Sequence, residues 1–412
     1  MPRPSKKDRV AALGLDLAGL SAVPPHLAEG PDTVAMNGKG IDDDPQDFAE
    51  FFAFDERAKV TPDRRTLYLV PLGLTAGALA PHDAMGVPFP DLRDIGAFLT
   101  AFTGLPHKLL PAMPVVPWSG GGGGKKRKAS GASYMAVRTS TSEVRVREGA
   151  PKDGEFPSAL HCHDLLDALL EELPKDAFTI IGFTAHDIHE DGVPVGGRAF
   201  GGSRIAVVSL ARYHPAFDDV TREWPAWGGK GGPALAAARA AHAAAVPRAA
   251  AAPPAAARTA LWAQRVAVTA AHELGHCLGL DHCVYYTCWM GENEGQAPYA
   301  CPVCLRKLLC ATGGDALRCA DAAPAIAHYA DVQRYCATQP LSPAWAALGA
   351  WCGARRAELD GGGGGGAAGS GGGGAAASSG GGSGGGAAAS GGGGAASSGG
   401  GGGGGDASAT GC

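Results

Sequence analysis

The sequence is poor in aromatic residues, carries no excess of basic charge and contains no long uninterrupted apolar run. Aromatic residues make up 7% of its 412 positions, and 35 Lys and Arg against 40 Asp and Glu give a formal net charge of −5. A broad basic surface for nucleic acid is therefore not expected. The longest alanine-rich stretch, residues 233–260, is interrupted by Arg, His and Pro, so it does not predict a transmembrane helix.

A secretory signal is also missing, because no apolar signal-peptide core follows residues 1–9. The chain has 11 cysteines, and an odd number without such a signal argues against a disulfide framework. Six of them fall within residues 277–310, beside three histidines. That density indicates metal ligands.

Glycine, in contrast, is abundant: its 65 residues gather in blocks, not at every third position, which excludes collagen. We expect residues 1–48 to form a flexible lead, 49–345 the main domain, 346–360 the end of a C-terminal helix, and 361–412 a disordered tail of Gly, Ala and Ser. Two low-complexity insertions, at 119–131 and 224–257, interrupt the main domain. The first contains the basic run Lys125–Lys128.

Hydrophobic patterns predict the elements of the main domain. Runs of β-formers predict strands at 66–72, 177–184 and 205–210, and the proline-punctuated residues 109–116 predict an edge strand. Amphipathic spacing predicts helices at 91–102, 164–173 and 258–278. This order predicts an α+β (mixed α/β) fold in which a mixed sheet packs on a central helix.

The most informative stretch is H-E-x-x-H-x-x-G-x-x-H at residues 272–282. His272 and His276 lie one helical turn apart on the same face, where both can reach one Zn²⁺. Gly279 suits a left-handed turn that ends the helix and brings His282 back as a third ligand. Three histidines leave a fourth position open for water, as in catalytic sites, and Glu273 is placed to take a proton from that water.

Cysteines follow this motif directly. Cys283 and Cys288 with Cys301 and Cys304 make a four-cysteine set without an open position, which predicts a structural zinc. A redox pair at Cys301 and Cys304 is the less favoured alternative, because the βαβ context it needs is missing. We expect Cys277 and Cys310 to be buried thiols, although Cys310 is near enough in sequence to substitute as a ligand. Met290 is either core filler or a methionine turn beneath the catalytic metal.

The segment H-E-x-x-H-x-x-G-x-x-H-C-x4-C-x-M, followed by C-P-V-C-L-R-K-L at 301–308, resembles the archaemetzincins. Residues 68–73, 165–187 and 209–213 are also similar to family segments, so the resemblance covers roughly residues 50–340. It implies a metzincin-like zincin fold, a catalytic zinc at the three histidines and a structural zinc at the four cysteines. Asp187–Glu190 reads D-I-H-E where the family usually has D-L-Y-P, which we expect to alter either the wall of the substrate cleft or a contact in the sheet.

The function implied is zinc-dependent hydrolysis of peptide bonds, with aminopeptidase-like action as the finer expectation. Zinc-bound water would be activated by Glu273, and Arg212, Tyr285 and Tyr286 are candidates for a second oxyanion donor. The expected partner is a peptide or protein substrate, with no nucleic acid and no membrane, and a monomer is favoured. We expect an intracellular protein, cytoplasmic or nuclear, with organellar targeting left open. The alternative function is a catalytically inactive zinc-binding scaffold, which intact Glu273 disfavours.

Overall fold

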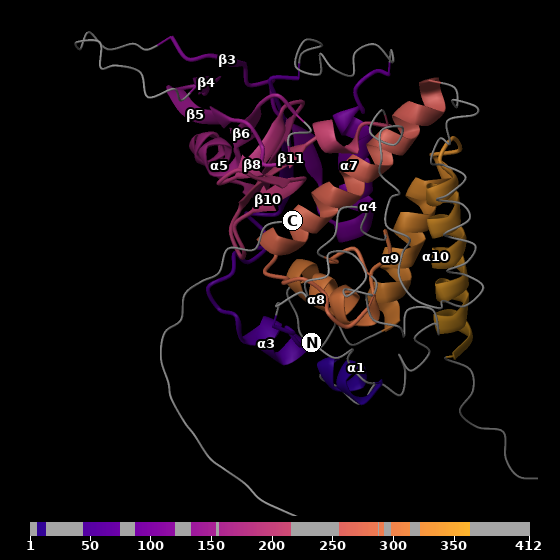
Figure 1. Cartoon of the computed structure of the whole chain (residues 1–412). Coiled ribbons are helices and arrows are strands. Elements are labelled where there is room, and N and C mark those ends of the chain that lie inside the picture. Colours follow the sequence, from indigo (N-terminus) through magenta and orange to yellow (C-terminus); the bar gives the residue numbers. More distant parts are fainter. Residues whose placement is uncertain are drawn as a thin grey trace, which may run out of the picture.

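The computed structural model describes residues 6–13, 44–74, 87–119, 133–153, 156–215, 255–286, 288–291, 298–313 and 322–362 (Figure 1). Almost all of both predicted insertions, including Lys125–Lys128, lies outside these ranges, as does the tail beyond residue 362. Within the described ranges, no helix combines the length and the apolar character that crossing a membrane requires.

A five-stranded mixed sheet lies at the centre of the molecule, with strand order β10-β11-β7-β1-β2. Its strands are β1 (Thr66–Leu72), β2 (His107–Leu109), β7 (Ala177–Thr184), β10 (Gly197–Ala199) and β11 (Ile205–Ser209). The β1, β2, β7 and β11 pairings are parallel, whereas β10 runs antiparallel to β11 at one end of the sheet. Three of these strands coincide with the β-rich runs in the sequence.

Both faces of this sheet are buried, because helices cover each of them. Along β1, Leu67 and Leu69 join the hydrophobic cluster that contains helix α7 (Ala255–Cys277), and Val70 and Leu72 join the cluster that contains helix α5 (Cys162–Glu171). Figure 1 shows α5 and α7 on opposite sides of the strands. The predicted mixed sheet packed on a central helix is therefore confirmed.

A second sheet encloses the other side of α5, with strand order β3-β4-β5-β6-β8-β9. Its strands are β3 (Val115–Pro117), β4 (Ser133–Arg138), β5 (Glu143–Gly149), β6 (Ala159–His161), β8 (Asp187–Glu190) and β9 (Val193–Val195). The edge strand predicted at 109–116 is not one strand but is divided between β2 and β3, each of which lies at the edge of its sheet. The chain there leaves β2 of the first sheet at Leu109 and enters β3 of the second at Val115, and Pro111 and Pro114 lie between them, where they cannot donate to a ladder.

Four helices pack beside α7. They are α4 (Leu92–Thr103), α8 (Pro302–Gly313), α9 (Ala322–Ala337) and α10 (Pro343–Gly362). Phe98 of α4 lies 4.6 Å from the Trp345 ring of α10 and 5.3 Å from the Tyr335 ring of α9, measured between ring centroids. The C-terminal helix expected to end over residues 346–360 thus begins at Pro343 and packs on the core.

The N-terminal lead differs from the flexible segment that we expect. Residues Lys6–Ala12 form helix α1, and Ala12 and Leu13 are buried in the same cluster as α7. Helix α3 (Phe48–Ala53) begins at an Asp47 capping box and packs on α8. Apolar side chains in this segment find a surface on distant parts of the chain, which composition alone does not reveal. The predicted boundary at residue 49 stays a prediction.

Candidate metal centre

Three histidines converge at the C-terminal end of α7. His272 and His276 lie one turn apart on the helix, and the chain turns at Gly279 to bring His282 back beside them. Gly279 has a φ of +90°, a conformation that L side chains rarely adopt, and an added Cβ would lie 2.7 Å from Arg57 Cδ. Glycine is therefore required at this turn for both its backbone and its size.

The geometry of this cluster fits a metal ion. One ligand nitrogen from each histidine lies within 4.8 Å of the others, and the Nε2 atoms of His272 and His276 are 3.0 Å apart. Two nitrogens on a tetrahedral zinc would be about 3.4 Å apart, given Zn–N bonds of about 2.0–2.1 Å. All three imidazoles are buried. A buried group of three imidazoles at this spacing is suited to zinc.

Backbone carbonyls orient two of the rings. The Nδ1 atom of His272 lies 2.9 Å from the Trp289 carbonyl oxygen, and Nδ1 of His276 lies 2.8 Å from the Leu280 oxygen. Because a carbonyl oxygen only accepts, each Nδ1–H must donate, which leaves the Nε2 lone pairs for a metal. Burial and the neighbouring imidazoles also lower the pKa of His272 well below its usual value, which favours the neutral form that ligation needs.

Glu273 lies beside this cluster in an enclosed environment. Its side chain is 1% exposed, and its Oε1 atom has no hydrogen-bond partner among the described residues. Burial raises its pKa to about 8, and the positive charge of Arg198 opposes that rise. A carboxylate that is buried and unpaired in this way is a stronger base than an exposed one.

Met290 lies directly beneath the histidine-bearing turn of α7. It is fully buried, and an added Cβ on Gly275 would lie 2.3 Å from its sulfur atom. Gly275 lies between His272 and His276, so Met290 packs against the backbone that carries both ligands. Met290 fills core volume at this position, and its role as a methionine turn stays a prediction.

Four cysteines form a second group next to the first. Cys283 directly follows His282, and its sulfur lies 3.7 Å from that of Cys301. A tetrahedral zinc with Zn–S bonds of about 2.3 Å separates its sulfurs by about 3.8 Å. Cys288 and Cys304 complete the group, with all four sulfurs within 4.8 Å of one another and buried. Hydrogen bonds from the other three thiols lower the pKa of Cys283, which favours a thiolate there.

The two other cysteines considered from the sequence lie outside these groups. Cys277 is buried, and its sulfur lies 3.5 Å from the hydroxyl of Thr179 and 3.6 Å from the carbonyl oxygen of Ile205, on the sheet side of α7. Cys310 is buried on α8, and the four-cysteine group forms without it.

Two comparisons with known proteins agree with this pair of groups. The chain is 26% identical over 278 residues to archaemetzincin-2 of Macaca fascicularis, an alignment that covers 65% of each protein. It is 27% identical over 273 residues to archaemetzincin-1 of Homo sapiens, which covers 64% of this chain and 46% of that protein. The chain is thus similar to archaemetzincins over about two-thirds of its own length. It thus spans about two-thirds of the length of archaemetzincin-2 and less than half of archaemetzincin-1.

The other comparisons add little to this similarity. The solved archaemetzincin of Methanopyrus kandleri aligns at 17% identity with a TM-score of 0.32, over 60% of this chain and 96% of that one. A score this low carries no weight. No family model matches the chain.

The three candidate oxyanion donors are all buried. Arg212 is 1% exposed and bonds through Nε and Nη2 to both carboxylate oxygens of Asp187, at 2.6 and 2.7 Å, and through Nη1 to Asp153. Tyr285 and Tyr286 are buried, and burial next to the cysteine group raises their pKa. Two carboxylates thus pair with the guanidinium of Arg212. One of them, Asp187, is the residue that D-I-H-E shares with D-L-Y-P, so this ion pair does not involve the positions at which the two patterns differ.

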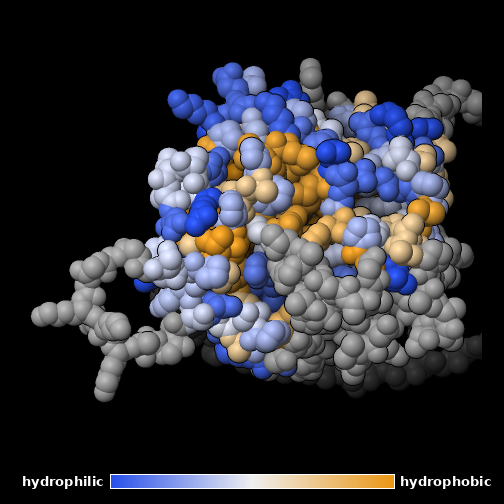
Figure 2. All heavy atoms as spheres, turned by 90° about the horizontal axis from the view of Figure 1, so that it is seen from above, coloured by the Kyte–Doolittle hydropathy of each residue, from blue (hydrophilic) through white to orange (hydrophobic). Residues whose placement is uncertain are grey.

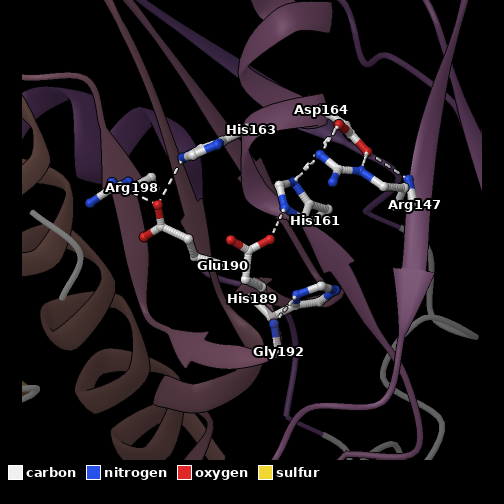
Figure 3. Close-up of polar contacts among 9 residues, drawn as sticks. Arg147, His161, His163, Asp164, His189, Glu190, Gly192 and Arg198 are labelled. Carbon is white, nitrogen blue, oxygen red and sulfur yellow. Dashed lines mark hydrogen bonds and ion pairs between the residues drawn. The ribbon is translucent and has the colours of Figure 1, made fainter. Parts of the chain in front are cut away.

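Residues of β10 also contribute to the site, although no sequence motif predicts this. An added Cβ on Gly197 would lie 2.5 Å from Glu273 Oε1, so this strand passes directly beside the carboxylate. The next residue, Arg198, is fully buried on the opposite face and donates to Glu190 at 2.9 Å. Glu190 also pairs with His163 at 3.1 Å (Figure 3). The pairing of β10 with β11 places Gly197 and Arg198 here, and no local sequence pattern predicts that pairing.

Proposed function

We propose that this protein is a zinc-dependent metallopeptidase that hydrolyses peptide bonds, with zinc held by His272, His276 and His282. The observation that carries this proposal is the buried Glu273 carboxylate, with an Oε1 atom that has no described partner, next to three imidazoles whose ring nitrogens converge. The similarity to archaemetzincin-2 and archaemetzincin-1 supports it. A structural metal site needs no such base.

The protein's own groups supply orientation and proton transfer. A zinc ion at a three-histidine site would act as a Lewis acid toward the scissile carbonyl and would lower the pKa of a bound water. The Trp289 and Leu280 carbonyls hold the imidazoles in the tautomer that binds metal. Glu273 takes a proton at Oε1 from the attacking water and passes it to the leaving amine. The positive charge of the metal would lower the raised pKa of the Glu273 carboxyl.

We further propose a second, structural zinc at Cys283, Cys288, Cys301 and Cys304, giving two zinc ions per chain. The spacing of the sulfurs and their complete burial support this assignment. With four thiolate ligands, no position remains open for a substrate, so this metal would contribute to folding alone.

Aminopeptidase-like action is the finer part of the proposal. It is tested with pairs of peptides that differ only in N-terminal acetylation, incubated with the zinc-loaded wild type and with Glu273→Gln. We expect cleavage of the free peptides by the wild type, little cleavage of their acetylated partners, and loss of cleavage in the variant. Equal cleavage of both partners would exclude aminopeptidase-like action.

An inactive zinc-binding scaffold is the alternative function. The same experiment separates the two, because zinc content is measured in both proteins. If the wild type and Glu273→Gln each hold zinc at the histidines and neither cleaves any peptide of a broad library, the scaffold is correct and the peptidase assignment fails.

A further inference from the structure

The turn that carries the chain from His276 to His282 is held from outside by one residue of the N-terminal segment, Gln46. Gln46 precedes helix α3 and is 8% exposed. Its side-chain amide donates from Nε2 to the carbonyl oxygen of Gly279 at 3.1 Å and to Oδ2 of Asp281 at 2.9 Å. Its Oε1 atom accepts from the backbone N–H of Asp281 at 3.2 Å.

These contacts surround the peptide that orients a candidate ligand. Leu280 lies between Gly279 and Asp281, and its carbonyl oxygen accepts the hydrogen bond from Nδ1–H of His276. His282 comes one residue after Asp281. The Gln46 amide therefore lies where it can fix the position of one imidazole and the return path of another.

A buried lysine holds Gln46 in turn. Lys307 is 2% exposed, and its Nζ atom donates to the Gln46 backbone oxygen at 2.5 Å and to Oε1 at 2.8 Å. Lys307 lies on α8, one helical turn after Cys304 of the cysteine group. Gln46 thus connects α8, which carries Cys304, to the turn between His276 and His282, and it precedes both by more than 230 residues in the sequence.

We propose that Gln46 is a positioning residue for the histidine site, and that Lys307 fixes Gln46 in place. The proposal rests on the proposed function for the identity of the metal. Only an amide satisfies all of these contacts, because the same side chain must accept from Lys307 and from the Asp281 N–H while it donates to Gly279 and Asp281. A glutamate would keep the acceptors, lose both donors and place a second carboxylate beside Asp281.

The test compares metal binding at the two groups within the same molecule. Cobalt(II) is titrated into the metal-depleted full-length chain, and thiolate-to-metal absorption reports the cysteines while the weaker ligand-field bands report the histidines. Gln46→Ala and Gln46→Glu should weaken binding at the histidines about 10- to 100-fold and leave the cysteine signal unchanged. The matched control is Asp47→Ala, which removes the α3 cap one residue away without touching the turn.

A second measurement does not depend on metal binding. In the protein as purified, hydrogen exchange at the Asp281 amide should be at least about 10-fold faster in Gln46→Ala than in the wild type, because its acceptor is gone. Unchanged exchange together with unchanged affinity at the histidines would overturn the proposal. So would a variant that loses both metals equally, or an Asp47→Ala control that reproduces the effect. A wild type that takes up metal at the cysteines alone would instead refute the proposed function, and hydrogen exchange would still decide the role of Gln46.

Discussion

At the scale of single residues, the site depends on two glycines whose lack of a side chain leaves room for neighbouring groups. Glycine at 275 leaves room for the Met290 sulfur, and glycine at 197 leaves room for the Glu273 carboxylate. Each would be in contact with an added methyl group at 2.5 Å or less. The position of the base relative to the histidines is therefore set partly by the backbone of β10.

This predicts that Gly197→Ala lowers peptidase activity without removing the metal. The new Cβ would push Glu273 Oε1 aside, and a displacement of about 1 Å can cost about 10²-fold in rate. We expect kcat to fall and zinc content to stay at the wild-type level, as measured by peptide cleavage and metal analysis. Gly201→Ala is the control, because an added Cβ there meets no atom within 4 Å. Unchanged kcat in Gly197→Ala would show that β10 does not position the base.

At the scale of elements, α9 is attached to α4 through a histidine that must stay neutral. Nδ1 of His328 donates to the Phe102 carbonyl oxygen at 2.9 Å, and its ring contacts the Phe102 ring edge-on. Burial lowers the pKa of His328 from 6.5 to about 4. Between these two values the unfolded chain binds one more proton than the folded chain, so stability falls as the pH falls.

We therefore expect His328 to account for about 3 kcal/mol of the stability lost between pH 6.5 and pH 4. The measurement is urea unfolding at several pH values for the wild type and for His328→Asn, whose amide can donate in place of Nδ1–H and does not titrate. The variant should be less stable than the wild type at pH 7 and should lose less stability on acidification. Parallel pH profiles of the two proteins would contradict this role for His328.

Local patterns predict those elements in which one physical requirement dominates. The stripe of Trp262, Val266, Ala270 and Leu274 predicts α7, and the spacing of His272 and His276 then brings two ligands together. The chain between β2 and β3 is different, because its hydrophobicity fits a strand of either sheet and its prolines divide it between both. Gln46 and Gly197 carry no local signal, since their roles arise from contacts with residues that are distant in sequence.

At the scale of the whole molecule, the two groups of ligands share one continuous segment. His282 and Cys283 are adjacent, and the Cys283 N–H donates to the Met290 carbonyl oxygen at 2.8 Å, next to the carbonyl of Trp289 that orients His272. The space-filling view in Figure 2 shows apolar side chains gathered toward the middle of the face seen from above, with hydrophilic side chains around them. The histidine group and the cysteine group are both buried and are linked by this one segment.

This arrangement predicts that Cys301→Ser removes the structural zinc and also weakens the histidine site. We expect the loss of at least one zinc per chain and a thermal midpoint lower by roughly 10 °C, since loss of a structural metal is among the most destabilising changes. Cys352→Ser is the matched control, because Cys352 is equally buried but lies on α10 outside the group. Metal analysis and thermal unfolding of both variants provide the comparison. Two zinc ions in Cys301→Ser would exclude the four-cysteine site.

The most direct test of the proposed peptidase is the cleavage rate of Glu273→Gln at zinc occupancy equal to that of the wild type. The substitution keeps the shape of the side chain and removes its ability to take a proton at Oε1. We predict that the variant retains zinc at His272, His276 and His282 and that kcat/KM falls by about 10²- to 10⁴-fold, the usual contribution of a general base. A fully loaded variant that cleaves peptides at the wild-type rate would contradict the role of Glu273 and the mechanism built on it.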